Sequence, residues 1–302
     1  MLYDIIIIGA GPAGLTSAIY AKRANKNVLV LEAKNYGGQI INTLDIENYP
    51  ANEHISGFDF ATNLYNQAKN LGAEIKYEKV VDINNLGKEK EVITTKNTYK
   101  TKTIIIATGS ENRKLGLPNE DEFASKGISY CATCDGAFYK EKTVAVVGGG
   151  NTALEDALYL ADLASKVYLI HRRDEFRGEE STINLLKEKD NIEFLYNSNV
   201  TKLNTKDRLE SIEVTSNDGE TRTIDVDALF IAIGRIPENQ NFAKLINLDN
   251  AGYIISNEYC HTNVEGIFVA GDCRTKKIRQ ITTATGDGAV AAMTACRYLG
   301  EQ

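Results

Sequence analysis

Short apolar runs that end at glycine-rich turns recur along this chain. Residues 5–8 are four consecutive isoleucines, which is typical of a strand buried on both faces. Residues 9–14 form a glycine-rich turn, residues 15–23 have the composition of a helix, and residues 28–31 form the next apolar run. The pattern therefore predicts a strand, a turn, a helix and a second strand at the start of the chain.

The same order of elements returns in mid-chain. Residues 144–147, 148–153, 154–163 and 166–170 predict a strand, a glycine turn, a helix and a strand. Further strands are expected at 103–109, 228–234 and 266–272, and a helix of small residues at 288–299. Pro237 and the polar residues 238–241 are expected to form a linker. Residues 75–101 and 192–224 alternate polar and apolar positions, which predicts an antiparallel meander in each domain. We therefore expect an α/β fold with two dinucleotide-binding units.

The first glycine turn has the spacing of a dinucleotide-binding loop. Gly9 allows the tight turn, Gly11 admits a pyrophosphate to the helix N-terminus, and Gly14 lets the helix approach the strand. Glu32 ends the second strand, where a carboxylate can accept hydrogen bonds from a ribose 2′-hydroxyl. This unit suits a free ribose, as in FAD or NAD. The alternative is a purely structural glycine-rich turn.

The second turn replaces the last glycine with Ala153, which the fingerprint tolerates. At the end of its second strand stand His171, Arg172 and Arg173, with Arg177 close behind. Arginines there can bind a 2′-phosphate through charge-assisted hydrogen bonds, whereas an acid would repel it. This unit therefore suits NADPH. The alternative is a solvated basic patch.

Two cysteines, Cys131 and Cys134, lie just before the second unit. The C-x-x-C spacing indicates a redox-active pair, half of a zinc site, or an inert buried pair. The only candidate second half, Cys260 with His261, has poor spacing for zinc, so redox chemistry is favoured. Asp135 could supply the proton that a leaving sulfur needs, or could simply be a turn residue.

The other cysteines, Cys260, Cys273 and Cys296, have no such context. We expect them to be small buried apolar residues, with Cys273 the one that could lie near a bound flavin.

Composition narrows the class further. The chain has 302 residues and a formal net charge of −7, without a long basic run, so nucleic acid and anionic membrane are not expected partners. No apolar run approaches the length of a membrane span. The chain enters a strand without a basic leader, which leads us to expect a cytoplasmic protein.

Together these motifs resemble the low-molecular-weight bacterial-type thioredoxin reductases, over essentially the whole chain. Besides the two glycine turns, the cysteine pair and the arginines, the matching segments are residues 37–39, 47–50, 107–109, 271–272 and 279–280. In some members of the family, two phenylalanines follow the Cys-Asp-Gly sequence. This chain differs from them, because it has Ala137, Phe138 and Tyr139 there.

The resemblance implies a homodimeric flavoprotein oxidoreductase. Its fold would be two Rossmann-like, three-layer ββα domains, with an NADPH domain (113–240) inserted into a discontinuous FAD domain (1–112 and 241–302). Electrons would pass from NADPH through FAD to the Cys131–Cys134 disulfide and then to oxidised thioredoxin. Cys134 would face the flavin, Cys131 would attack thioredoxin, and Asp135 would be the acid/base.

The implied ligand sets are long. FAD would be held by Gly9, Gly11, Pro12, Ala13, Gly14, Glu32, Gly38, Gln39, Asn48, Ala107, Thr108, Gly109, Gly271, Asp272, Arg279, Gln280 and Ile281. NADPH would be held by Gly148, Gly150, Asn151, Thr152, Ala153, His171, Arg172, Arg173, Arg177 and Gly234. No metal is expected. The rival interpretations are a flavin reductase with another electron partner such as ferredoxin, a flavoprotein redox sensor without turnover, and a zinc-stabilised scaffold.

Overall fold

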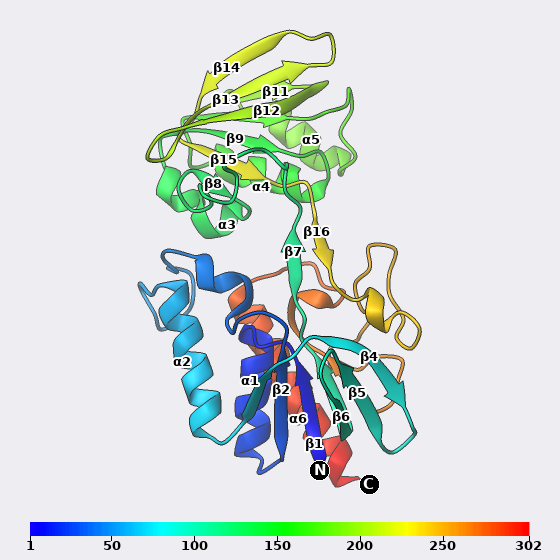
Figure 1. The fold of residues 1–302 in the computed structure, drawn as a ribbon. Helices are drawn as coiled ribbons and strands as arrows, with labels where there is room; N and C mark the ends of the chain where they lie inside the picture. The colour runs from blue at the N-terminus through cyan, green and yellow to red at the C-terminus, as the bar shows by residue number, and fades with distance from the viewer. Residues whose placement is uncertain (302) are drawn as a thin grey trace. The chain divides into compact units, whose positions relative to one another are not determined.

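The computed structural model describes residues 1–301, which form two compact units. The first unit comprises Met1–Glu111 and Ile236–Gln302, and the second comprises Asn112–Arg235. The chain passes between them twice, at β7 (Ser110–Asn112) and β16 (Arg235–Pro237), and these two strands pair with each other (Figure 1). No helix among residues 1–301 has both the length and the apolar character that a membrane crossing requires.

The first unit contains a seven-stranded sheet in the order β3-β2-β1-β6-β5-β4, with β17 also paired to β6. Its strands are β1 (Leu2–Ile8), β2 (Val28–Glu32), β3 (Glu74–Tyr77), β4 (Val80–Asn85), β5 (Lys90–Thr94), β6 (Thr98–Ile106) and β17 (Ile267–Val269). Its helices are α1 (Pro12–Arg23), α2 (Gly57–Asn70) and α6 (Ile281–Gly300), with short 3-10 turns η1 (Gly38–Asn42), η3 (Gln240–Phe242) and η4 (Gly271–Cys273).

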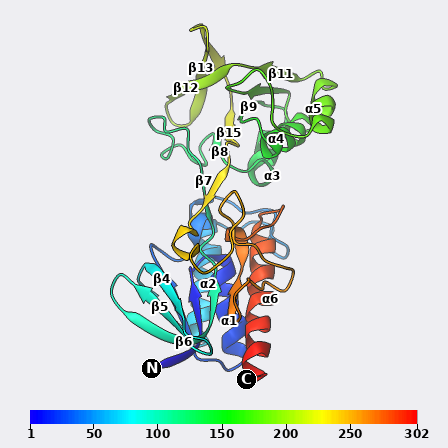
Figure 2. The same ribbon diagram turned by 90° about the vertical axis from the view of Figure 1, so that its right-hand side faces the viewer.

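Alternation along β1 produces three layers in this unit. Ile5 and Ile7 pack with the helices α1 and α6 in one buried cluster. Ile6 and Ile8 point to the opposite face and pack with side chains of the β4–β5 meander. Because both faces are covered, the run of isoleucines is buried throughout. Figure 2 shows the helices on one side of the parallel strands and the meander on the other.

The second unit repeats this plan. Its parallel sheet has the order β11-β10-β9-β15-β8, and a separate antiparallel sheet has the order β12-β13-β14. The strands are β8 (Ile128–Ser129), β9 (Thr143–Val147), β10 (Lys166–Ile170), β11 (Ile192–Leu195), β12 (Ser198–Thr205), β13 (Leu209–Ser216), β14 (Thr221–Asp225) and β15 (Ala228–Ile231). The helices are α3 (Ala132–Asp135), α4 (Asn151–Ala161) and α5 (Glu180–Lys187), with the 3-10 turn η2 (Gly136–Tyr139).

Here β9 separates the layers. Val144 and Val146 pack against α4, whereas Ala145 and Val147 pack against the meander. The expected α/β architecture of two Rossmann-like units, each with layers of helix, parallel sheet and meander, is therefore confirmed.

Two expectations about individual segments need correction. The starts of the predicted meanders, β3 and β11, pair in parallel with β2 and β10 and so extend the parallel sheets. Residues 238–241, predicted to be a linker, are anchored inside the first unit. Asn239 is fully buried, and its Nδ2 donates to the carbonyl oxygens of Gly252 (2.9 Å) and Cys273 (2.8 Å), which supply the acceptors that a buried amide needs.

Candidate functional site

A cavity of about 510 Å³ opens where the parallel strands of the first unit end. Its wall includes the residues that follow β1, β2, β6 and β17, so it lies at the carboxyl edge of the sheet, where doubly wound folds bind ligands. Its volume is in the range of small-molecule and cofactor sites. The predicted flavin residues in the wall are Gly9, Gly11, Pro12, Ala13, Glu32, Gly38, Gln39, Ala107, Thr108, Gly109, Gly271, Asp272, Gln280 and Ile281.

The glycine turn leaves backbone exposed to this cavity. Gly9 has φ +107°, a conformation that only glycine adopts readily, and a side chain there would overlap the carbonyl oxygen of Ala107. A Cβ on Gly38 would lie 3.4 Å from the Cα of Gly11, so the two glycines bring bare backbone close together in the cavity wall. Such a cradle fits a chain of phosphates beside the N-terminus of α1.

Glu32 is held rigidly at the end of β2. Its Oε2 accepts from the backbone N–H of Ala10 (2.7 Å), and its Oε1 accepts from that of Lys34 (2.8 Å). Each carboxylate oxygen has a second acceptor site. The carboxylate is thus oriented to accept hydrogen bonds from ribose hydroxyls.

Three predicted flavin residues lie outside the cavity wall. Gly14 serves packing, because a Cβ there would overlap the carbonyl oxygen of Gly9. Asn48 donates to Oε1 of Gln280 (3.4 Å), and so contacts the wall. The guanidinium of Arg279 lies 4.1 Å from the centre of the Tyr253 ring.

The second glycine turn repeats the strand-to-helix geometry. Gly148 has φ +157°, and α4 begins after Gly150, whose surroundings would leave space for a ligand group. Gly148 also packs against the buried Ala153, so that alanine serves helix packing. The Asn151 side chain accepts from the backbone N–H of Glu179 (2.7 Å). Thr152, beside it at the start of α4, is exposed.

The residues after β10 divide into one buried ring and three exposed cations. His171 is 5% exposed, packs on the backbone of Gly149, and has Nε2 3.0 Å from the carbonyl oxygen of Glu175. Burial, with help from the neighbouring arginines, lowers the pKa of His171, which favours the neutral ring. Arg172, Arg173 and Arg177 are exposed, and none forms an ion pair with a residue of the described range 1–301.

Another glycine expected at the nucleotide, Gly234, has φ +106° and accepts at its carbonyl oxygen from the Arg113 backbone N–H (2.9 Å).

Cys131 and Cys134 form a disulfide that closes around the short helix α3. The backbone N–H groups of Cys134 and Asp135 both donate to the carbonyl oxygen of Cys131, at 3.2 and 3.1 Å. Both cysteines are half-buried. A small, partly accessible disulfide in a tight loop can exchange with an external dithiol or disulfide.

Asp135 adjoins this disulfide and is largely shielded from solvent. Burial raises the pKa of Asp135 above its usual value, and a hydrogen bond from Ser129 Oγ to its Oδ2 (2.6 Å) acts in the opposite direction. A carboxyl with a raised pKa keeps its proton to higher pH than usual and can give it up to a leaving thiolate. The cysteine motif itself gives no indication of the Ser129 contact.

The remaining cysteines lie where apolar side chains are expected. Cys260 and Cys273 are fully buried, and burial raises the pKa of both thiols. Cys296 is half-buried against the core of the first unit. Cys273 follows the cavity-lining pair Gly271 and Asp272.

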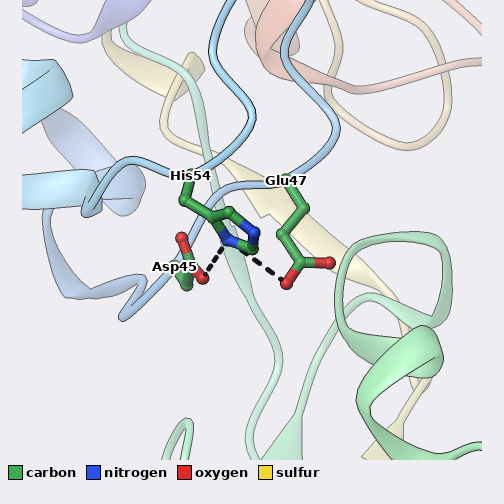
Figure 3. A group of neighbouring side chains, drawn as sticks. All are labelled: Asp45, Glu47 and His54. Atoms are coloured by element: carbon green, nitrogen blue, oxygen red, sulfur yellow. Dashed lines mark hydrogen bonds and ion pairs between the residues drawn. The ribbon is translucent and has the colours of Figure 1, made fainter.

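A group of charged side chains lies on the exposed loop that contains Asn48 (Figure 3). His54 Nδ1 is 2.8 Å from Asp45 Oδ2 and 3.6 Å from Glu47 Oε1. The hydrogen bond and charge of Asp45 raise the pKa of His54. The ion pairs account for this arrangement, which ties the two ends of the loop together.

Several residues of the cavity wall belong to no sequence motif. The cavity wall also includes Lys34, Lys79, Glu238, Asn241 and Phe242. Of these five residues, only Lys34 could be expected in the wall from the sequence, because it comes two positions after Glu32, which ends the strand.

Comparison with known proteins places the chain among enzymes of one kind. The family model described as "Pyridine nucleotide-disulphide oxidoreductase" matches residues 3–288. The thioredoxin reductases of Listeria innocua and Bacillus subtilis are each 42% identical over 99% of this chain, and the matches cover 95% and 96% of those proteins. The crystal structure of thioredoxin reductase from Streptococcus pyogenes superposes with a TM-score of 0.96 at 40% identity, covering 100% of this chain and 99% of that one.

Proposed function

The chain belongs to the pyridine nucleotide-disulphide oxidoreductase family, and we infer that it is an NADPH-dependent thioredoxin-disulfide reductase containing FAD. The observation that carries this inference is the Cys131–Cys134 disulfide with a shielded carboxyl beside it, in a unit that also contains a nucleotide-binding turn. The activity transfers electrons from a nicotinamide donor to the disulfide of a protein substrate.

We assign FAD to the first unit. The glycine cradle would hold its pyrophosphate, and Glu32 would accept hydrogen bonds from its ribose. When bound there, FAD would supply the redox chemistry that links a nicotinamide to a disulfide. The wall at Gly271, Asp272, Gln280 and Ile281 would hold the rest of the molecule.

We assign NADPH to the second unit. The turn at residues 148–153 would receive the pyrophosphate, and Arg172, Arg173 and Arg177 would bind the 2′-phosphate. Support comes from the exposure of these arginines and their lack of ion pairs within residues 1–301. The ring of His171 would hold the loop in place by packing on Gly149. Burial lowers the pKa of His171, so this ring would not bind phosphate as a cation.

The cysteine pair would exchange its dithiol for the disulfide of thioredoxin. The thiolate of Cys131 attacks that disulfide and forms a mixed disulfide, while the released sulfur takes a proton from Asp135. Asp135 then takes the proton of Cys134, and the Cys134 thiolate attacks the sulfur of Cys131. The second thioredoxin sulfur leaves and takes from Asp135 the proton that came from Cys134. In total, two electrons and two protons reach thioredoxin.

The protein would act as a homodimer in the cytoplasm. A reducing compartment suits an enzyme whose product is a dithiol. Exposed apolar side chains on α1, α2 and α6, among them Tyr20, Phe58 and Met293, offer surface for a second copy. Light scattering coupled to size-exclusion chromatography gives the oligomeric state directly.

Oxidation of NADPH coupled to reduction of thioredoxin tests the activity. We expect turnover with NADPH and oxidised thioredoxin, and loss of turnover when Cys134 is replaced by serine. Reduced ferredoxin replaces NADPH in a parallel assay. Turnover with ferredoxin alone would refute the nicotinamide assignment, and absence of thioredoxin reduction with either donor would refute the proposed substrate.

A further inference from the structure

Ser129 lies at the end of β8, two residues before the redox-active loop. Its side chain is buried, at 4% exposed. Parallel pairing of β8 with β15 places Ser129 opposite Phe230, so the sheet fixes its backbone. The hydroxyl therefore has a defined position relative to the cysteine loop.

This one hydroxyl contacts both ends of the loop. The backbone N–H of Cys131 donates to Ser129 Oγ (3.1 Å), and an amide can act only as donor there. The hydroxyl proton is then free to bind Asp135 Oδ2 at 2.6 Å, with the carbonyl oxygen of Cys131 a more distant acceptor at 3.3 Å. Ser129 thus links the first cysteine to the carboxyl that follows the second.

We propose that Ser129 is a positioning residue for dithiol–disulfide exchange. It holds the Asp135 carboxyl beside the cysteine pair and stabilises the ionised carboxylate between the two proton transfers. The proposal rests on the function inferred above, in which Asp135 gives a proton to a leaving sulfur and recovers one from Cys134. Without Ser129, the shielded carboxylate would lose a charge-assisted hydrogen bond and would retain its proton to higher pH.

Among the groups around Asp135, this hydrogen bond is the one that lowers the pKa of the carboxyl. Burial raises the pKa of Asp135, and Ser129 is the group that opposes this effect. Tyr139, on η2, is the titratable neighbour: burial and the charge of Asp135 raise its pKa, so it stays neutral. Arg208 and Asp227 act on Tyr139 with opposite signs.

Helix α4 packs against α3 and contributes a second titrating carboxyl. Tyr159 faces Gly136 from α4. Burial and the neighbouring Glu155 raise the pKa of Asp156 to about 7, so Asp156 could also produce a transition near neutral pH. The experiment must therefore separate Asp135 from Asp156.

The test is the pH dependence with which dithiothreitol reduces the Cys131–Cys134 disulfide in the oxidised holoenzyme. Alkylation followed by mass spectrometry counts the new thiols, and each rate is divided by the thiolate fraction of the reagent. In the parent the corrected rate falls as Asp135 ionises, because the leaving sulfur loses its proton donor. In Ser129→Ala we expect this fall at least about one pH unit higher, equivalent to about 1.4 kcal/mol.

Matched variants identify the carboxyl. Asp135→Asn should abolish the fall, and Ser129→Ala combined with Asp135→Asn should behave like Asp135→Asn alone. Ser198→Ala removes another buried hydroxyl of the same unit, which donates to the Tyr196 carbonyl (2.7 Å), and should retain the parent profile. Asp156→Asn should retain it too.

Ser129→Thr and Ser129→Val form a second pair, nearly equal in size and differing in the hydroxyl. If Ser129→Ala unfolds early, this pair carries the test: threonine should keep the parent profile and valine should shift it. A hydroxyl-free variant with the parent profile, or a shift that persists without the Asp135 carboxyl, overturns the proposal. Neither NADPH nor thioredoxin enters this assay, so failure of the proposed function would appear separately, in the coupled assay.

Discussion

Replacing Arg172 and Arg173 together with alanine should change the preference between the two nicotinamide nucleotides. Both residues come just after β10 and His171, at the position where such units contact the ribose of a dinucleotide. Both are exposed, and neither forms an ion pair within the described residues 1–301, so the substitutions break no internal salt bridge. The loss should therefore fall on the 2′-phosphate and little on folding.

The magnitude follows from the number of contacts and their exposure. A hydrogen bond to a charged group contributes about 1.5–3 kcal/mol, and solvent reduces this at an exposed site. With about 1–1.5 kcal/mol for each arginine, the pair contributes about 2–3 kcal/mol. At about 1.4 kcal/mol per factor of ten, KM for NADPH should rise roughly 30- to 150-fold.

Steady-state reduction of thioredoxin with NADPH and with NADH is the assay. KM for NADH should change by less than about twofold, because NADH lacks the phosphate. Arg222→Ala is the matched control: Arg222, on β14, is also partly exposed in this unit, but it pairs with Glu193 on β11 at 2.7 Å. Equal losses with both nucleotides, or a similar effect of Arg222→Ala, would refute the assignment of the arginines to the 2′-phosphate.

Three further outcomes are expected. Cys134→Ser should abolish disulfide reduction but retain bound FAD, seen as an unchanged flavin absorbance with no thioredoxin turnover; loss of the flavin would instead indicate a structural role. Gly14→Ala should lower both the melting temperature and FAD retention, because its Cβ would overlap the Gly9 carbonyl oxygen, whereas Gly87→Ala, at an open turn, should leave FAD bound. Nuclear magnetic resonance should find the pKa of His54 above its ordinary value of 6.5, and Asp45→Asn should lower it. Since the folded pKa is raised, the stabilising contribution of this pair is present below the ordinary value and is lost as pH rises through the folded value.

The fold could be predicted where its causes are local. Isoleucine runs that end at glycines predict buried parallel strands, and both glycine turns lie at the start of helices, as expected. Helix α2 was not among the expected elements, although Ser56 begins it by accepting from the Asp59 backbone N–H (3.0 Å). Its apolar positions are spaced more widely than those of the strands, so its sequence pattern is weaker.

The parts of the structure that could not be predicted depend on side-chain contacts that no sequence motif indicates. Ser129 carries no motif, and only the folded loop shows that its hydroxyl reaches Asp135. Glu120 likewise accepts from the backbone N–H groups of Leu115 and Gly116 and from the Tyr130 hydroxyl, a set that no local pattern indicates. The polar stretch around Asn239 predicts a linker, because local polarity gives no sign that Gly252 and Cys273 accept from its side chain.

The visible spectrum of the purified protein, recorded without oxygen before and after addition of each nucleotide, tests the central claim most directly. We predict a yellow protein whose flavin absorbance bleaches with NADPH far more readily than with NADH, and recovers when oxidised thioredoxin is added. A colourless protein that cannot be reconstituted with FAD, or a flavin that NADPH leaves oxidised, would contradict the account.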